Sequence, residues 1–143
     1  MKKLIAIVAS EPNSINSEII AKAWKKIKNK KNLFVIGNFL ILKRQIKKIN
    51  IKIKLSKIDS IDKFKNNKNL NILDVPYKFK HIFKNNLKDI QNYVLKSLQT
   101  AHDLAFSKKI KGFINAPVNK AIFNNKQIGV TEYLAKKNNV KNK

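Results

Sequence analysis

The chain has 143 residues, of which 43% are hydrophobic, so it is long and apolar enough to fold as one domain or as part of a longer protein. It has no cysteine, which excludes a disulfide framework and a thiolate zinc site, and its two histidines are too few for a self-contained histidine cluster. The formal net charge is +24, but Arg44 is the only arginine among the 32 basic residues.

A charge of this size is typical of proteins that bind nucleic acid or an anionic membrane surface. Arginine supplies the bidentate contacts to phosphate and guanine, however, and a nucleic-acid-binding protein with a single arginine would be unusual. The lysines are spread along the chain beside abundant Asn and Ile, and these three residues share A/T-rich codons. We therefore favour a compositional bias. A small lysine-rich nucleic-acid-binding protein, or a non-catalytic partner protein, stays open as the alternative.

The N-terminus begins with Met1-Lys2-Lys3 and an apolar run, Leu4–Ala9, which together resemble a signal peptide. The run is short, and Ser10–Asn13 offers no small-residue cleavage site, so we predict a first β-strand and a cytoplasmic location. No apolar run approaches the ~18–20 residues of a membrane span.

Apolar runs and helical periodicities alternate along the chain, which predicts an α/β fold. The strict alternation of residues 51–55, with lysines on one side, indicates a strand in an exposed or edge position. The predicted elements are a strand at 3–9, a helix at 18–28 with Ser17 as N-cap, a strand at 33–36, a helix at 39–49, a strand at 51–55, a poorly structured stretch at 58–71, a strand at 71–76, a loop at 77–86, a helix at 86–108 and a buried strand at 112–116.

The most informative stretch begins at that last strand. Pro117 stops the strand and suits the first turn of a helix, so Asn119 and Lys120 fall where the chain enters it. In an open α/β sheet, ligands bind outside the carboxyl ends of the strands, which is where this corner would lie. A second polar turn at 124–126 precedes a short helix at 132–136, and residues 136–143 are expected to fray.

Residues 116–135, APVNKAIFNNKQIGVTEYLA, resemble a segment of the 4-hydroxythreonine-4-phosphate dehydrogenase family. That family has a Pro-Val-His/Asn-Lys stretch followed by a Gly-His-Thr-Glu block whose His and Thr contact the phosphorylated substrate. Here Val130 takes the place of the His, while Thr131 and Glu132 match. An earlier corner keeps the family's Glu-Pro and Ser-Glu outline, with Ser14 and Asn16 in place of glycines.

The resemblance implies a three-layer α/β/α fold with a largely parallel sheet, similar to isocitrate and isopropylmalate dehydrogenases. It implies NAD-dependent oxidation of 4-phosphooxy-L-threonine in pyridoxine and pyridoxal phosphate biosynthesis, with a divalent metal ion, by a homodimer. The family's three metal-binding histidines and most of its NAD-binding region come later in its chain. We therefore expect residues 1–143 to be a single α/β unit like the N-terminal part of a longer two-domain dehydrogenase, without metal ligands and without independent catalysis.

The resemblance places the substrate's phosphate near Thr131 and near Val130, the position of the family's His. A hydroxyl beside backbone N–H groups at a helix start suits a phosphate, although Thr131 could instead only cap the helix at 132–136. Lys120 could attract the phosphate as a point charge or could simply be solvated. Asn119 could contact the ligand or orient its own turn.

Three further polar residues are weaker candidates. His102 lies in the apolar helix at 86–108, where a structural role is expected, and His81 is a surface candidate in the loop. Asp74 ends a strand, where a turn or cap role is the default. No catalytic or NAD-binding residue is identified, because the sequence has no GxGxxG motif and no P-loop.

Overall fold

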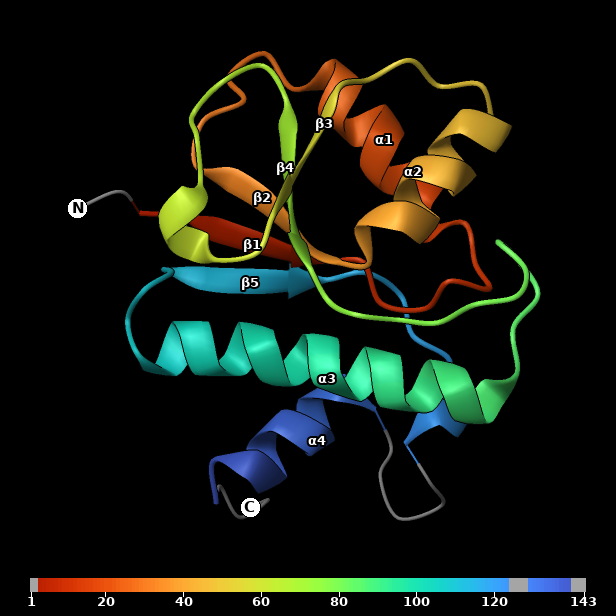
Figure 1. Cartoon of the computed structure of the whole chain (residues 1–143). Helices are drawn as coiled ribbons and strands as arrows, with labels where there is room; N and C mark the ends of the chain where they lie inside the picture. The colour runs from red at the N-terminus through yellow and green to blue at the C-terminus, as the bar shows by residue number, and fades with distance from the viewer. Residues whose placement is uncertain (1–2, 124–128, 140–143) are drawn as a thin grey trace.

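The computed structural model describes residues 3–123 and 129–139, and within these residues five parallel strands form one sheet in the order β3-β4-β2-β1-β5 (Figure 1). In chain order the elements are β1 (Ile5–Val8), α1 (Asn16–Lys26), β2 (Leu33–Gly37), α2 (Phe39–Lys48), β3 (Leu55–Ile58), the 3₁₀ helix η1 (Ile61–Lys63), β4 (Leu70–Asp74), α3 (Leu87–Phe106), β5 (Gly112–Asn115), the 3₁₀ helix η2 (Lys120–Ile122) and α4 (Val130–Lys137).

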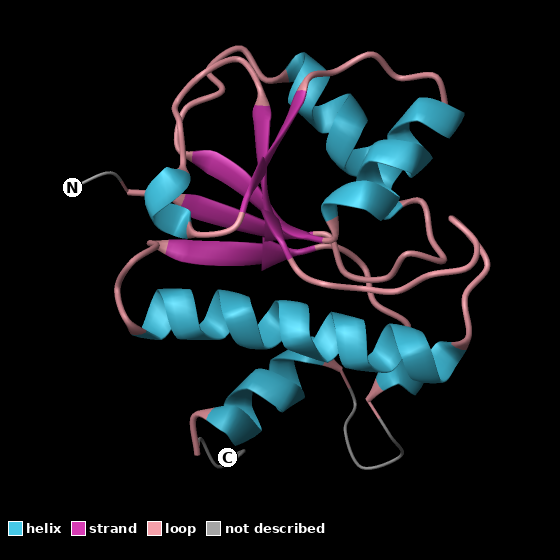
Figure 2. Cartoon of the chain, in the orientation of Figure 1, coloured by secondary structure: helices cyan, strands magenta, loops and turns pink. Residues whose placement is uncertain are grey.

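Helices cover both faces of the sheet, which confirms the predicted three-layer, parallel α/β fold (Figure 2). α1 and α2 lie on one face and α3 on the other, with α4 on the far side of α3 (Figure 1). Phe34 and Ile36 of β2 point into the apolar cluster beneath α3, and Val35 points into the cluster beneath α1 and α2. The strand is therefore apolar throughout because both of its faces are buried.

α3 matches its predicted range closely because its sequence carries an N-cap residue and a long apolar stripe. Asn86 is the N-cap, and its Oδ1 accepts a hydrogen bond from the Lys88 N–H at 2.8 Å. The residues that it buries recur at helical spacing: Ile90, Tyr93, Val94, Ser97, Leu98 and Ala101.

The end of α3 holds a strained residue that suggests a stabilising substitution. The Lys109 N–H donates to Leu104 O at 2.9 Å and the Lys108 N–H to Ala105 O at 3.0 Å, the pattern that ends a helix with a left-handed residue. Lys108 occupies that position with φ of 59°, where glycine is preferred.

We expect Lys108→Gly to raise the free energy of unfolding by about 1 kcal/mol, because the left-handed conformation costs a lysine roughly that much. Urea unfolding measures the change. Lys109→Gly is the matched control and is expected to give no gain. Equal stabilisation by both variants would contradict the assignment of strain to Lys108.

The strand predicted at 51–55 is wrong in position, because β3 runs from Leu55 to Ile58. Pairing with β4 starts only at Lys54, whose carbonyl accepts from the Leu70 N–H at 2.9 Å. Ile53 is half-buried because it packs against the cluster beneath α1 and α2, so the alternation came from that packing and not from a strand ladder. The predicted edge position is confirmed. The stretch predicted as poorly structured, 58–71, in fact contains the end of β3, η1 and the start of β4.

Four other details of the prediction are corrected. α1 starts at Asn16 with Ile15 as its N-cap residue, so Ser17 is not the cap. β5 is the edge strand opposite β3 and is not buried, with Ile114 60% exposed. After Pro117 the chain stays irregular and then forms only the short turn of η2. α4 runs from Val130 to Lys137, so it begins two residues before the helix predicted at 132–136 and ends one residue after it. The polar turn predicted at 124–126 lies outside the described residues.

Candidate functional site

The carboxyl ends of the strands meet at one edge of the sheet, as parallel pairing requires. Three loops gather there: the one that follows β1 and leads to α1, the one that follows β4 and leads to α3, and the one that follows β5 and leads to η2 (Figure 1). We refer to this edge, with these three loops, as the carboxyl-end rim.

The loop after β1 is fastened to the loop after β5 by contacts between residues about a hundred positions apart. The Glu11 carboxylate accepts a hydrogen bond from the Asn119 N–H at 2.8 Å. Asn16 Nδ2 donates to Pro117 O at 2.8 Å and to Ala9 O at 3.0 Å. Asn16, which stands where the related family has glycine, therefore holds the two corners together.

The same loop is also fastened to the loop after β4. Asn13 Nδ2 donates to Asn85 O at 2.8 Å, and Asn13 Oδ1 accepts from the Asn85 N–H at 2.8 Å. Gln45, a buried residue of α2, donates through Nε2 to the carbonyls of Pro12 and Ile82. Neither Asn13 nor Gln45 was predicted as a site residue. The sequence signal that could have identified Gln45 was its position within the apolar stripe of the amphipathic helix α2.

Two buried polar atoms near this loop have no hydrogen-bond partner among the described residues. They are Asn16 Oδ1 and Ser17 Oγ, and the two residues are only 2% and 3% exposed. A buried polar atom without a partner costs about 1–3 kcal/mol. Native structures contain only a few such atoms.

A second polar cluster fixes the exits of β2 and β4. Asn38 caps α2 by accepting from the Ile41 N–H at 3.0 Å, and Asp74 accepts from the Phe39 N–H at 2.8 Å. Lys57 Nζ lies 3.4 Å from the Asp74 carboxylate. Asp74 therefore supports the start of a neighbouring helix, which agrees with the cap role expected for it.

Tyr93 of α3 joins this cluster from below the sheet. Its hydroxyl accepts the Asn38 N–H at 2.7 Å, and its ring stacks on Tyr77 with centroids 4.6 Å apart. Burial, which disfavours the phenolate, raises the pKa of Tyr93 well above 10. Gly37 makes the contact possible, because a Cβ there would lie 3.0 Å from the Tyr93 hydroxyl oxygen.

Asn119 and Lys120 lie at the rim and are both exposed. Asn119 Oδ1 accepts the Ala121 N–H at 3.0 Å, so Asn119 caps η2, while its own N–H is held by Glu11. This geometry agrees with the alternative that Asn119 orients its turn. Among the described residues no hydrogen-bond partner is found for its Nδ2, which is therefore the donor available to a ligand.

Val130 and Thr131 form the first turn of α4. Gly129 is the N-cap residue, and its carbonyl accepts from the Tyr133 N–H at 3.1 Å, so the alternative that Thr131 caps the helix is wrong. Thr131 is exposed beside the first-turn N–H groups. Val130 is half-buried and packs against the cluster beneath α3. Among the described residues, no hydrogen bond or ion pair joins Thr131 to Asn119 or Lys120.

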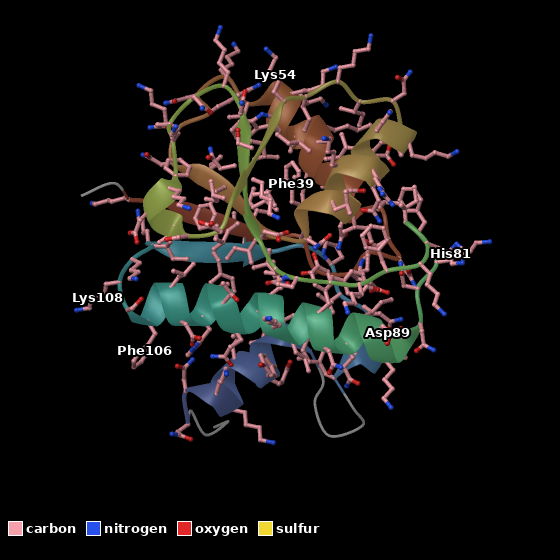
Figure 3. All side chains as sticks on the ribbon, viewed as in Figure 1. Phe39, Lys54, His81, Asp89, Phe106 and Lys108 are labelled. Atoms are coloured by element: carbon pink, nitrogen blue, oxygen red, sulfur yellow. The ribbon has the colours of Figure 1, made fainter. Side chains whose placement is uncertain are left out.

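The loop after β4 contributes a hollow of about 450 Å³ to the rim region, lined by Lys78, Phe79, Lys80, His81, Lys84, Asn85, Asn86 and Asp89. His81 is exposed on this loop (Figure 3). His102, by contrast, connects α3 to the end of α4, because its Nε2 lies 2.9 Å from Asn138 Oδ1 and its ring stacks on Phe106. It has the structural role expected for it.

Exposed lysines are found on α1, α2, α3 and α4, and so on helices that cover both faces of the sheet. Lys54 and Lys108 mark two separate parts of the molecular surface (Figure 3). In residues 3–123 and 129–139 no three His, Asp or Glu side chains lie close enough to hold a metal ion. No helix in that part of the chain is long and apolar enough to cross a membrane.

A family model and several solved structures point to the same family. A family model described as pyridoxal phosphate biosynthetic protein PdxA matches residues 29–143. A structure from Salmonella typhimurium, named as a 4-hydroxythreonine-4-phosphate dehydrogenase, superposes with a TM-score of 0.84 at 26% identity over 95% of this chain and 44% of its own. A structure of the same name from Burkholderia phymatum gives a TM-score of 0.84 at 19% identity, over 99% of this chain and 45% of its own. One from Klebsiella pneumoniae gives a TM-score of 0.81 at 23% identity, over 94% of this chain and 44% of its own.

This chain therefore spans less than half of the length of each of these solved structures. A search of the curated proteins finds no match. The agreement in fold confirms the expected isocitrate dehydrogenase-like architecture.

Proposed function

The chain belongs to the PdxA family of pyridoxal phosphate biosynthetic proteins, and from that membership we propose that it forms the substrate-binding edge of an NAD-dependent 4-hydroxythreonine-4-phosphate dehydrogenase. The substrate would be 4-phosphooxy-L-threonine, oxidised at its hydroxyl carbon during pyridoxine synthesis. The solved relatives named for this activity support the proposal.

One observation carries the proposal to particular residues. Glu11 of the loop after β1 and Asn16 at the start of α1 hold the loop after β5, which presents Asn119 and Lys120 to solvent at the carboxyl-end rim. Holding both corners in place before the ligand arrives lowers the entropy lost on binding. A cationic side chain on a fixed corner at this edge suits a phosphorylated ligand.

Three groups are proposed to bind the phosphate. The Lys120 ammonium supplies charge, the Thr131 hydroxyl supplies a hydrogen bond, and the first-turn N–H groups of α4 supply the positive end of a helix. Val130 adds no donor where the related family has histidine, so we expect weaker phosphate binding than a histidine would give. Asn119 Nδ2 is placed to donate to the ligand's polar groups.

Hydride transfer to NAD needs the bound nicotinamide, a polarised hydroxyl and a base. The described residues do not fit a metal site, and the sequence has no GxGxxG motif for a dinucleotide. We therefore derive no catalytic step from this chain and assign it binding and orientation. We expect the purified 143-residue chain to show no NAD-dependent turnover with this substrate, and NADH formation above a no-enzyme control would contradict that expectation.

Calorimetric titration of the chain tests the binding role. 4-Phosphooxy-L-threonine is expected to bind more tightly than 4-hydroxy-L-threonine, and Lys120→Ala is expected to weaken the phosphorylated ligand about five- to tenfold, or roughly 1–1.4 kcal/mol. Lys54→Ala, at the amino end of the sheet, is the charge-matched control and should leave binding unchanged (Figure 3). Equal losses in the two variants would mean that net charge, and not the rim, attracts the ligand.

A further inference from the structure

A hollow of about 450 Å³ lies at the amino end of the sheet, on the side opposite the carboxyl-end rim. Its walls are the loop that joins α1 to β2 and the loop that leads into β4. Four lysines line it: Lys28, Lys30, Lys31 and Lys68. Among the described residues asparagines complete the lining, so the hollow carries positive charge and no carboxylate.

A second hollow, of about 600 Å³, adjoins the first, because Lys30 and Lys68 line both. It brings in three further lysines: Lys25, Lys52 and Lys54. Lys52 and Lys54 flank Ile53 in the stretch before β3, where Ile53 packs inward and both lysines are exposed (Figure 3). In the described part of the chain, no Asp or Glu lines this hollow either. We call the two together the amino-end hollows.

The lysines of the amino-end hollows carry charges that no carboxylate neutralises. Elsewhere in the fold, Lys57 Nζ lies 3.4 Å from the Asp74 carboxylate and Lys63 Nζ lies 2.9 Å from that of Asp59. Within residues 3–123 and 129–139, no such ion pair involves a lysine of the amino-end hollows. A lysine-rich composition explains how many lysines the chain has, but not why these surround two hollows without a carboxylate. Like charges gathered in this way repel each other, and a bound anion would relieve that repulsion.

The walls of the amino-end hollows are joined to each other before any ligand binds. Asn66 Oδ1 accepts a hydrogen bond from the Asn32 N–H at 3.3 Å, which joins the loop before β2 to the loop before β4. Asn69 Nδ2 donates to Ser56 Oγ at 3.0 Å, which joins the loop before β4 to β3. Loops fixed in this way lose less entropy when a ligand binds.

We propose that the amino-end hollows bind single-stranded nucleic acid through its phosphate groups. A single strand carries regularly spaced negative charges, and its flexible backbone can follow a concave surface lined by ammonium groups. The chain's only arginine, Arg44, lines neither hollow, so binding is independent of base sequence. A ligand with one phosphate meets few of these lysines and binds weakly, which separates this surface from the rim.

Other polyanions fit the amino-end hollows less well. The two apolar residues in their lining are Trp24, which is 3% exposed, and Ile53, which is half-buried, so neither can insert into a lipid surface. Inorganic polyphosphate offers the exposed amide of Asn29 only acceptors, whereas the bases and sugars of a nucleic acid offer donors as well.

Fluorescence anisotropy of the 143-residue chain with a labelled single-stranded oligonucleotide of mixed sequence tests the proposal. The site variant removes three exposed lysines of the first hollow by the substitutions Lys28→Ala, Lys31→Ala and Lys68→Ala. It should weaken binding at least about tenfold and reduce the slope of log K against log salt concentration by about 2, since each lost phosphate contact contributes roughly 0.7. The control variant has the same net charge and removes three exposed lysines of α3 and α4: Lys88→Ala, Lys96→Ala and Lys136→Ala. It should lose less than about threefold in affinity.

All six of these side chains are exposed, so both variants should fold, and circular dichroism checks that. Equal losses in the two variants would overturn the proposal, because net charge alone would then attract the strand. So would the absence of binding at low salt. Tighter binding to vesicles of anionic phospholipid or to inorganic polyphosphate would also overturn it, since the occupant would then be another polyanion. None of these outcomes depends on whether the rim binds a phosphorylated substrate, because neither variant changes a residue of the rim.

Discussion

Asn16→Asp is expected to lower the free energy of unfolding by about 3 kcal/mol at neutral pH. The substitution keeps the shape of the side chain but replaces an NH₂ group by a carboxylate oxygen. That oxygen would face the carbonyls of Ala9 and Pro117, which lie 3.0 and 2.8 Å from Asn16 Nδ2. At 2% exposure, water cannot compensate the lost hydrogen bonds or the buried charge.

Asn86→Asp is the matched control. Asn86 is exposed, and its Oδ1 accepts the Lys88 N–H at the start of α3, a role that aspartate fills equally well. Urea unfolding should show little change for this control. The deficit of Asn16→Asp should shrink in acid, because protonating the introduced carboxyl removes its charge and restores a donor. A loss below about 1 kcal/mol would mean that Asn16 does not hold the two corners of the rim.

Tyr93→Phe is expected to cost about 2 kcal/mol of stability. The Asn38 N–H, in a residue that is 6% exposed, donates to the Tyr93 hydroxyl and would lose its partner. Tyr133→Phe is the control, because Tyr133 is half-buried and its described contacts are made by its ring. If the two variants lost equal stability, the hydroxyl of Tyr93 would not be the cause.

The raised pKa of Tyr93 also predicts how the free energy of unfolding responds to alkaline pH. Burial raises the pKa of Tyr93 above its unfolded value near 10, so the folded state keeps this proton longer than the unfolded state does. The stability that the protonated Tyr93 hydroxyl contributes is complete below pH 10 and is lost as the pH rises above it. Burial also raises the pKa values of Tyr77 and Tyr133. The slope of stability against pH above 10 should therefore be smaller, but not zero, in Tyr93→Phe.

The regular parts of the fold could be predicted because local signals agreed with the tertiary structure. α2 has an asparagine cap and α3 a long apolar stripe, and both lie close to their predicted ranges. The strand predicted at 51–55 failed because Ile53 is buried by a helix-side cluster before the strand begins. Local alternation cannot distinguish these two kinds of burial.

The rim could be predicted only in part. Its position after the last strand follows from α/β topology, and Asn119 and Lys120 lie there. The residues that hold it together were not predicted, because the contacts of Asn16 with Pro117 and of Asn13 with Asn85 join distant parts of the sequence. A buried asparagine in a polar turn looks the same in sequence as a solvated one.

The most direct test of the account is to map ligand binding by NMR, following the backbone amides of the chain as 4-phosphooxy-L-threonine is added. The largest shifts are expected on Asn119, Lys120 and Thr131, with smaller ones at Glu11 and Asn16 through their contacts with the loop after β5. Shifts confined to residues 28–31 and 66–68, which line a lysine-rich hollow at the amino end of the sheet, would contradict it. They would mean that general positive charge, and not the carboxyl-end rim, attracts the phosphate.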